Sequence, residues 1–512
     1  MAHQKSSYCT ISLILNGGRF SIEPMTQFGI SLLSILISVS VFADEQSATR
    51  TQLLSYPTQK TQVNISDITV DAKKSNHELN VSLMGQAYFE SSEVAEASEQ
   101  IYQLQHKYAY EKNNQKIQTH FIFGGYAKKQ FLYGAVPELY YQFKQSDNSS
   151  ANQNLHVNQT YIVGRKIIES SRIDQMFNLG LMNPTLTQDF VTYQQQGLTG
   201  FHQGIDSKMW GIQLGFLPVY LPNQGPSVKE INGKIEGSNR WVKKPPAQFA
   251  FNDSNKEIIY SVKYDEVSKL IFTPGALAQI RIGQKDQQLH LISTFSKRPM
   301  NEPILERETF ADLDVVGKVN LIPNVIYDDL VTTDLRYQNA NFKMAISYIS
   351  DRPENKTAQS FYSIQNLQPI NGYSIVAEYK LPAYKTKSIL IGFGAAEFSG
   401  GEITDINDDG TENIFTFSKN RLQYKKPVQF YVRTDVFLVS GRMAQADIKW
   451  LYDREQKGTL LSAQIHIPAL KTLNANLGFD VLGTEEQKAE DYGFLQQFQA
   501  NDRVYGGLEY VF

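Results

Sequence analysis

Apolar and polar residues alternate through long stretches of this 512-residue chain, and that period of two restricts the fold more than any other feature. Apolar residues fill almost every second position from Val428 to Leu438 and again from Leu473 to Val481. Successive side chains of a β-strand point to opposite faces, so this alternation predicts strands with one apolar face. Further runs of the same kind occupy residues 342–348, 373–381, 444–452 and 461–467.

The joints between these runs alternate in length. Those at 438–441 and 468–471 have only a few residues, whereas those at 399–426 and 483–502 are long and polar. Transmembrane β-barrels show this asymmetry, with short turns at one end and long loops at the other. At about ten residues per strand, the chain accommodates roughly 16 to 20 strands. Between residues 322 and 370, however, the alternation does not yield a consistent number of strands.

The width of such a sheet decides which face points outward. A closed barrel of about sixteen or more strands has a lumen that side chains cannot fill, so an apolar inner face would border water. Turned outward, the same face meets lipid, and closure leaves no unpaired strand edge in the hydrocarbon. The sequence therefore predicts an all-β fold, a transmembrane antiparallel β-barrel of roughly 16 to 20 strands with long outer loops and short periplasmic turns.

The N-terminal residues predict an exported protein. Residues 25–43 carry no charged side chain and end in Val-Phe-Ala, which suits a signal-peptidase site. We therefore predict a signal peptide at 25–43, preceded by a leader at 1–24 that is untranslated or dispensable. A single membrane anchor at 25–43 is the alternative, because about 19 uncharged residues can just span a bilayer. A periplasmic N-terminal segment at 44–78 and the barrel at 79–512 would follow.

The chain ends in YGGLEYVF, and alternate residues from Val504 to Phe512 would form the apolar face of a last strand. This ending resembles the C-terminal assembly signal of Gram-negative outer-membrane β-barrel proteins of the porin-like kind. The residues that fit the signal are Tyr505, Gly507, Tyr510 and Phe512. The resemblance implies a place in the lipid of the cell outer membrane and recognition by the barrel-assembly machinery. An accidental aromatic ending is the alternative.

The polar faces of the predicted strands carry charges of both signs. The pore-lining candidates are Arg281, Lys343, Glu378, Lys380, Arg433, Asp435, Asp447, Lys449 and Asp480. Five are cations and four are anions, so a strongly ion-selective pore is not indicated. The formal net charge is only −3, and no basic run suggests a nucleic-acid partner. These features favour an outer-membrane channel of porin type for small hydrophilic, weakly charged or neutral solutes, with saccharides as candidates.

Residues 184–246 differ from the rest in composition. The part after Phe216 is rich in proline and glycine, yet Ile231 and Trp241 are costly to leave in water. We expect this region to be a constriction folded into the barrel or a lid over its mouth. A blocked lumen would favour the alternative function, a non-conducting outer-membrane barrel that acts as an adhesin or structural scaffold.

Signatures of catalysis are scarce. The sequence has no metalloprotease helix, phosphate-binding glycine loop or nucleophile elbow. His202, Asp206 and Ser207 could suggest a barrel hydrolase, but ordinary loop polarity is the preferred interpretation. We therefore predict a protein that is not an enzyme.

One acidic segment has the spacing of a calcium loop. Asp405, Asn407 and Asp409 supply oxygens at the first, third and fifth places, and Gly410 suits the turn. Thr416 stands where the closing glutamate belongs, so a solvated acidic turn is preferred. We predict no cofactor, with calcium at these three residues as the weaker alternative.

Overall fold

The computed structural model describes residues 14–15, 18–19 and most of 74–512. The breaks within that last range are 90–97, 113, 128–130, 147–156, 227, 243–244, 246, 252–253, 264–266, 284–288, 312–316, 360–361, 385–386, 414–419 and 486–492. The chain divides into two compact units, Met1–Tyr56 and Pro57–Phe512. In the first unit, β1 (Ile14–Leu15) pairs with β2 (Gly18–Arg19). The predicted signal peptide at 25–43 lies outside the described residues.

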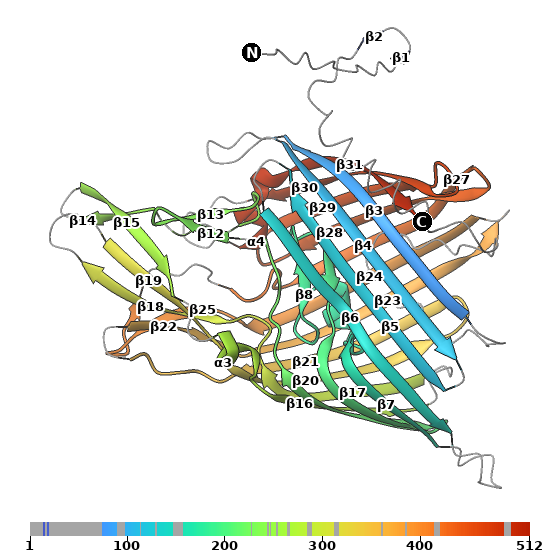
Figure 1. Cartoon of the computed structure of the whole chain (residues 1–512), viewed down its shortest axis with the longest axis horizontal. Coiled ribbons are helices and arrows are strands. Elements are labelled where there is room, and N and C mark those ends of the chain that lie inside the picture. Colours follow the sequence, from blue (N-terminus) through green and yellow to red (C-terminus); the bar gives the residue numbers. More distant parts are fainter. Residues whose placement is uncertain are drawn as a thin grey trace, which may run out of the picture. The chain divides into compact units, whose positions relative to one another are not determined.

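In the second unit, eighteen antiparallel strands close into a barrel, seen from the side in Figure 1. Each barrel strand pairs with the barrel strands before and after it in the chain, and the last, β31, pairs with the first, β3. This confirms the predicted fold class. The bounds are β3 (Lys74–Tyr88), β4 (Ser98–Lys112), β5 (Gln115–Tyr126), β6 (Phe131–Ser146), β7 (Asn158–Lys166), β10 (Leu198–Asp206), β11 (Trp210–Val219), β16 (Gly275–Ile282), β17 (Leu289–Pro299), β20 (Tyr327–Gln338), β21 (Phe342–Pro353), β23 (Ile370–Tyr384), β24 (Lys387–Gly400), β27 (Pro427–Val439), β28 (Arg442–Asp453), β29 (Gly458–Ile467), β30 (Leu473–Thr484) and β31 (Arg503–Val511).

The joints between barrel strands differ at the two ends of the barrel. One end, which we name the short-turn end, has joints such as 113–114, 207–209 and 440–441. The opposite end is the long-loop end. The six longest joints all lie there, at 167–197, 220–274, 300–326, 354–369, 401–426 and 485–502. Short turns at one end and long loops at the other are typical of transmembrane barrels.

The outer face of the barrel is apolar. Along β11 the side chains of Trp210, Ile212, Leu214 and Phe216 are exposed, while the residues between them are buried or half-buried. Most other barrel strands likewise expose large apolar side chains at alternate positions. Such a surface is stable in contact with lipid, whereas its exposure to water would cost free energy. Among the described residues, no helix is both long and apolar enough to cross a membrane.

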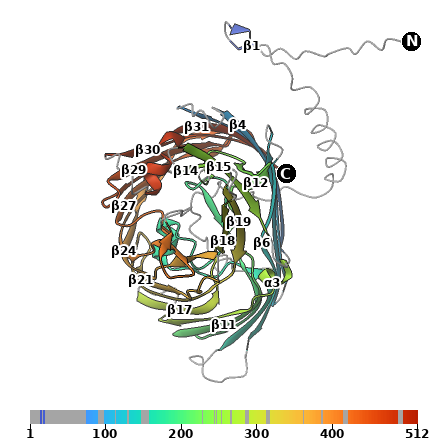
Figure 2. The same cartoon turned by 90° about the vertical axis from the view of Figure 1, so that its left-hand side faces the viewer.

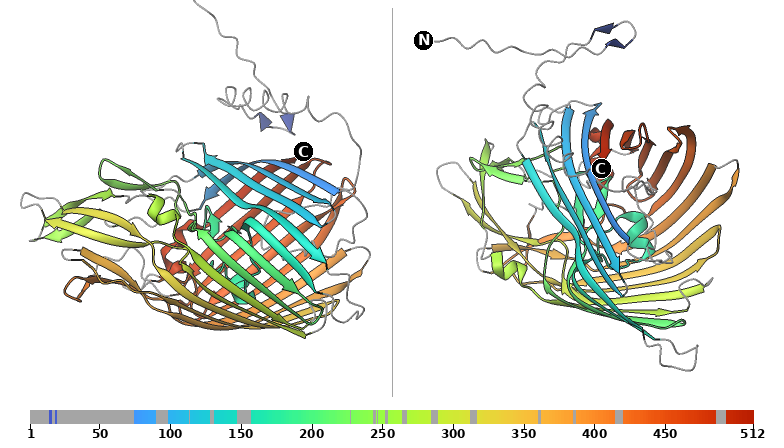
Figure 3. Two further views of the ribbon diagram at one scale, coloured as in Figure 1. Left: turned by 60° about the horizontal axis from the view of Figure 1, so that its bottom comes forward. Right: turned by 45° about the vertical axis from the view of Figure 1, so that its right-hand side comes forward.

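Four of the long loops build a separate seven-stranded sheet beyond the long-loop end (Figures 1 and 3). In sheet order its strands are β14 (Gln248–Phe251), β15 (Ser254–Val262), β19 (Gly317–Asn324), β18 (Ile304–Ala311), β22 (Tyr362–Leu367), β25 (Ile403–Asn407) and β26 (Glu412–Asn413). The hairpin of β12 (Val228–Ile231) and β13 (Lys234–Gly237) packs against β15, and α3 (Val267–Ile271) precedes β16. The ion pair of Arg307 with Asp405 is buried in this outer sheet.

Two predicted boundaries need correction. The barrel begins at Lys74, within the segment 44–78 that the sequence assigns to the periplasm. Residues 184–246 are not one constriction or lid, because they contain the barrel strands β10 and β11 as well as parts of two loops. The sequence does not reveal β10 because only Phe201 and Ile205 are large and apolar on its outer face, so the period of two is weak there.

Candidate functional site

The interior of the barrel holds the long loop between β7 and β10. This loop, residues 167–197, is named the lumen insert and contains α2 (Arg172–Phe177), β8 (Thr185–Thr187) and β9 (Tyr193–Gln195). In the end-on view of Figure 2 the blue-green insert lies inside the ring of strands. Ser171 caps α2, accepting a hydrogen bond from the backbone N–H of Asp174 at 3.3 Å. The insert therefore has secondary structure of its own.

The lumen insert reaches from one wall of the barrel to the other. It leaves the wall at β7, and Met176 and Phe177 contact β24 and β27, which lie on the opposite side of the ring in strand order. Gln429 Nε2 is 3.5 Å from Met176 Sδ, and the rings of Phe177 and Phe398 meet edge to face with centroids 6.3 Å apart. Gly394 permits this approach, because a Cβ there would lie 2.6 Å from Met176 Cε. The insert therefore bridges the lumen.

Three groups of hydrogen bonds and ion pairs, here named clamps, join the insert to the barrel wall. The first clamp is at the long-loop end of β17. Arg298 donates hydrogen bonds to the carbonyl oxygens of Leu181 and Met182, the second at 2.9 Å. Asn301 Nδ2 donates to the Gly180 carbonyl oxygen at 2.6 Å. Backbone carbonyls buried in a lumen need such donors, because water cannot reach them. The first clamp therefore supplies hydrogen-bond donors to the backbone carbonyl groups of the turn that follows α2.

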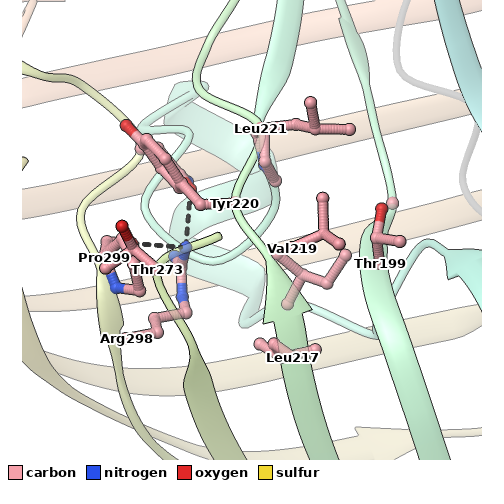
Figure 4. A pocket seen from close by; sticks show the side chains of 12 residues that line it. Thr199, Leu217, Val219, Tyr220, Leu221, Thr273, Arg298 and Pro299 are labelled. Carbon is pink, nitrogen blue, oxygen red and sulfur yellow. Dashed lines mark hydrogen bonds between the residues drawn. The ribbon is translucent and has the colours of Figure 1, made fainter. Parts of the chain in front are cut away.

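The wall around the first clamp is shown in Figure 4. Arg298 lies beside Tyr220 and Pro299, across an open hollow of about 310 Å³ from Leu217 and Val219. Arg298 is the one charged side chain among the residues that line this hollow. The hollow therefore offers no pair of opposite charges and no convergent acid and base.

The second clamp joins the start of α2 to β20. The guanidinium of Arg336 donates to Asp334 at 2.6 and 3.0 Å, to the carboxylate of Glu169, and to the Ser170 carbonyl oxygen at 3.2 Å. Asp334 also accepts the backbone N–H of Arg172 at 2.9 Å. Every polar group of Arg336 thus has a partner in the wall or in the insert.

The third clamp is at the seam where the barrel closes. Arg503, the first residue of β31, is buried and lies 2.9 Å from Asp189 of the insert and 2.7 Å from Asp480 of β30. It also donates to Gln86 of β3 at 2.9 Å, and its guanidinium is 5.5 Å from the ring centroid of Trp241. One arginine therefore connects the insert to the last two barrel strands and the first.

Toward the long-loop end, the insert packs into an aromatic core. Phe190 of the insert, Trp241, Phe494 and Phe498 form ring pairs whose centroids are 5.2 to 6.3 Å apart. The last two side chains come from the loop 485–502, which contains α4 (Phe494–Gln497) and the 3-10 turn η3 (Gln499–Asn501). Three separate loops therefore meet inside the barrel.

The inner face of the barrel is not polar along its whole length, which corrects the simple picture of an apolar outside and a polar inside. Near the long-loop end Leu330, Ile349, Leu451 and Leu460 belong to the core around the insert and are buried. Side chains of the wall alone cannot fill so wide a barrel. Loops folded into the lumen supply the missing apolar contacts, so apolar side chains on the inner wall are shielded from water.

The predicted pore-lining residues occupy strand positions that alternate with the exposed apolar ones, and so they belong to the inner face. Arg433 Nε pairs with Asp447 Oδ1 at 2.5 Å, and Arg281 Nη2 is 3.3 Å from Asp206. Asp480 is part of the third clamp. That these residues line a conducting path stays a prediction.

Several charged residues of the site carry no clear signal in the sequence. The clamps depend on Arg298, Arg336 and Arg503, and the insert contributes Arg172 and Asp189. The insert lacks both a period of two and a helical period, so nothing local shows which wall it will meet. Because the sequence does not reveal β10 either, the length of the joint between β7 and β10 was not available as a signal.

Asp174 is a buried carboxyl group inside the insert. Its oxygens accept the backbone N–H groups of Leu181 at 3.3 Å and Met182 at 3.1 Å. Removal from water raises the pKa of Asp174 to about 6, against these hydrogen bonds and the charge of Arg298, which favour the ionised form. The insert therefore contains a group that titrates under mild acidification.

The calcium candidates lie in the outer sheet, away from the lumen insert. Asp405 pairs with Arg307, Asn407 is the last residue of β25, and Asp409 lies in the turn between β25 and β26. Asp409 Oδ1 accepts the backbone N–H of Thr411 at 2.8 Å. Within the part of the chain that is described, no group of three or more His, Cys, Asp or Glu is arranged to hold a metal ion. Calcium binding at this turn stays a prediction.

The residues of the hydrolase alternative are not brought together. Asp206 follows His202 by four residues along β10, a separation of about 13 Å at the usual rise of a strand. Asp206 pairs instead with Arg281 at 3.3 Å. Ser207 lies in the turn after β10, where its N–H donates to the Trp210 carbonyl oxygen at 2.7 Å.

The C-terminal residues form the strand that closes the barrel. Tyr510 and Phe512 are each 39% exposed, and their ring centroids are 4.5 Å apart. A Cβ at Gly507 would lie 2.7 Å from the Leu83 carbonyl oxygen of β3, so a side chain there would obstruct the closing pair. Tyr505 alternates with the exposed residues and is half-buried. Recognition of this strand by an assembly machinery stays a prediction.

No protein-family model matches the sequence, and no curated protein is similar to it. Among solved structures, OccK11 (OpdR) of Pseudomonas aeruginosa is 9% identical, with a TM-score of 0.40 over 86% of this chain and 95% of that chain. A triple mutant of the Rhodopseudomonas blastica porin is 10% identical, with a TM-score of 0.35 over 86% of this chain and 100% of that chain. At scores this low the assignment as a barrel rests on the strand pairing of this chain itself.

Proposed function

We propose that the chain is a channel of porin type in the bacterial outer membrane and that it passes small hydrophilic solutes, neutral or weakly charged, with saccharides among the candidates. The observation that carries this proposal is a closed barrel with an apolar outer face and a charged inner face beside the lumen insert. At 18 strands, a barrel of this kind is wide enough for an aqueous passage next to an inserted loop.

The two ends of the barrel suggest an orientation. In outer-membrane barrels the long loops face the exterior and the short turns face the periplasm. The backbone N–H of Phe512 donates to the Leu79 carbonyl oxygen at 2.9 Å, which places the C-terminus at the short-turn end. The terminal strand β31 would then be open to the barrel-assembly machinery on the periplasmic side, as the assembly signal requires.

A second function is favoured by the apolar core around the insert. Phe190, Trp241 and the rings of the loop 485–502 fill part of the lumen, and four loops, one of which also carries Trp241, build the outer sheet. A barrel closed in this way would conduct nothing and would serve as an adhesin or scaffold through its outer sheet. Charged side chains also line the inner wall beside α2, where a sealed barrel would have no use for them, so we prefer the channel.

Planar-bilayer recording separates the two functions. Purified wild-type protein is expected to give discrete conductance steps. A variant in which a short Gly-Ser linker replaces residues 168–196 should give larger steps, because the insert bridges the lumen. If the wild type gives no current and the variant conducts, the scaffold function is favoured. If neither protein gives a current, the channel function is refuted.

A further inference from the structure

A charged recess lies inside the barrel between α2 of the insert and the wall of β20, β21 and β23. It is an open volume of about 310 Å³, and its charged lining residues are Arg172, Arg336, Lys343 and Glu378. Lys343 is the second residue of β21, so the recess is on the side of the insert that faces the short-turn end. A solute that passes the insert along this wall must move past these side chains.

The cations of the recess differ in how many of their hydrogen bonds are already made. Arg336 is fully engaged in the second clamp. Arg172 Nη1 donates to Gln175 at 3.1 Å, and among the described residues its other guanidinium nitrogens have no partner. The ammonium of Lys343 is exposed and forms no ion pair within the described residues. Arg172 and Lys343 therefore keep donors for a carboxylate.

The recess also presents a carboxylate beside these donors. Glu378 is the direct cross-strand partner of Lys343, so their Cβ atoms are about 5 Å apart. Glu378 Oε1 accepts the hydroxyl of Tyr431 at 2.5 Å, while Oε2 has no partner among the described residues. A free ammonium and a free carboxylate oxygen thus face the lumen side by side.

The charges of the recess sum to zero. Arg172, Arg336 and Lys343 contribute three positive charges, and Glu378 with the two carboxylates that hold Arg336 contributes three negative ones. A solute with only a negative charge would be attracted by Lys343 and repelled by Glu378. A solute with only a positive charge would be repelled by Lys343 and attracted by Glu378. A net-neutral solute that carries both charges on neighbouring atoms meets an attractive partner at each end.

We propose that this recess, the zwitterion recess, selects small zwitterionic solutes of the amino-acid class, with the carboxylate on Arg172 and Lys343 and the ammonium on Glu378. The inference rests on the proposed channel and names its preferred substrate class. Binding of this kind is useful in a channel only when it is weak enough for release. The recess therefore speeds the passage of a zwitterion without trapping it.

Liposome swelling with two neutral solutes of similar size tests the proposal. Alanine carries both charges, while lactamide carries a hydroxyl and an amide in their place. Wild-type protein is expected to admit alanine about threefold faster than lactamide, a modest factor because the site must also release the solute. Alanine at millimolar concentration should also interrupt the single-channel current, and lactamide should not.

Three variants locate the effect. Glu378→Gln removes the partner of the ammonium, and Arg172→Gln combined with Lys343→Gln removes the partners of the carboxylate, so each should lower the ratio of alanine to lactamide rates to about one. Lys107→Gln is the control, because Lys107 belongs to β4 on the opposite side of the ring, so the substitution changes the charge of the barrel without touching the recess. It should keep the wild-type ratio.

The outcomes separate the recess from the channel. Normal lactamide entry with no advantage for alanine would overturn the zwitterion recess and leave the channel standing. No entry of either solute and no current would overturn both. A wild-type ratio that survives in both recess variants would also refute the assignment. Equal melting temperatures of the variants would show that a lost ratio reflects the site and not unfolding.

Discussion

The two sides of the lumen insert meet different walls. Toward the long-loop end Phe190, Phe177 and Trp241 pack into an apolar core, and burial of each large side chain is worth about 1.5–3 kcal/mol. Toward the short-turn end the insert faces charges, and Arg172 and Lys343 retain unused donors. Burial on one side thus holds the loop in place, so that polar groups on the other side can stay available to a solute.

The clamps also differ from the recess in how their charges are used. In the third clamp, Arg503 is buried between Asp189 and Asp480, and removal of one partner from a buried pair costs about 3–5 kcal/mol. Of the recess charges, Arg172, Lys343 and Glu378 are half-buried or exposed, and exposed pairs are worth about 0–1 kcal/mol. Substitutions in the clamps, Arg336 included, should therefore loosen the insert, while substitutions of these three residues should change solute preference alone.

The largest effect is expected when the insert is removed. In the variant that replaces residues 168–196 by a short linker, conductance should rise several-fold, because the segment that bridges the lumen is gone. Lys166 and Leu198 are paired neighbours in β7 and β10, so a short linker can join them. Unboiled protein should still migrate faster than boiled protein on SDS gels, which shows that the barrel closes. Unchanged conductance would mean that the insert does not restrict the path.

A smaller effect is expected when only the apolar side of the insert is weakened. Phe177→Ala should destabilise docking of the insert by about 3–5 kcal/mol, because a large buried ring is lost. Limited proteolysis should then cut the insert faster, and the current should become noisier. Phe295→Ala is the control, since Phe295 is 47% exposed on the outer face. Equal cleavage of the two variants would show that the apolar core does not hold the insert.

Mild acid should have a moderate effect through Asp174. Burial raises its pKa from 3.8 to about 6, so the docked insert holds this proton more tightly than an undocked one. Docking is therefore weakest above pH 6 and strengthens as the pH falls toward 4, by at most about 3 kcal/mol. Proteolysis of the insert should be slower at pH 5 than at pH 7.5. Asp174→Asn should flatten this dependence, and an identical slope in that variant would assign it to other groups.

The smallest effect is expected in the outer sheet, which lies outside the lumen. Asp405 already pairs with Arg307, so chelator should not change the melting temperature relative to millimolar calcium. A cation that bound only the folded state would raise it by mass action. A higher melting temperature in calcium, lost in Asp409→Asn, would establish the cation site at this turn.

The sequence predicted those parts of the barrel that depend on local pattern. Between 428 and 481 the alternation marks β27 to β30 because the outer face of each strand meets lipid, so one side of the strand must be apolar. The same signal failed between 322 and 370 for an equally physical reason. There β19 and β22 of the outer sheet interrupt the barrel strands β20, β21 and β23, and a half-buried strand has a period of two in either sheet.

The path of residues 167–197 was decided only by the tertiary structure. Nothing in that segment shows that Asp189 will reach Arg503 at the seam or that Met176 will lie against Gly394 on the far wall. A period of two in the sequence reflects whether each side chain faces lipid or the interior of the barrel. Every strand of a barrel has the same two surroundings, so each strand shows the same pattern. The burial of a loop instead depends on matching surfaces from strands far away in the chain, which become neighbours only when the barrel closes.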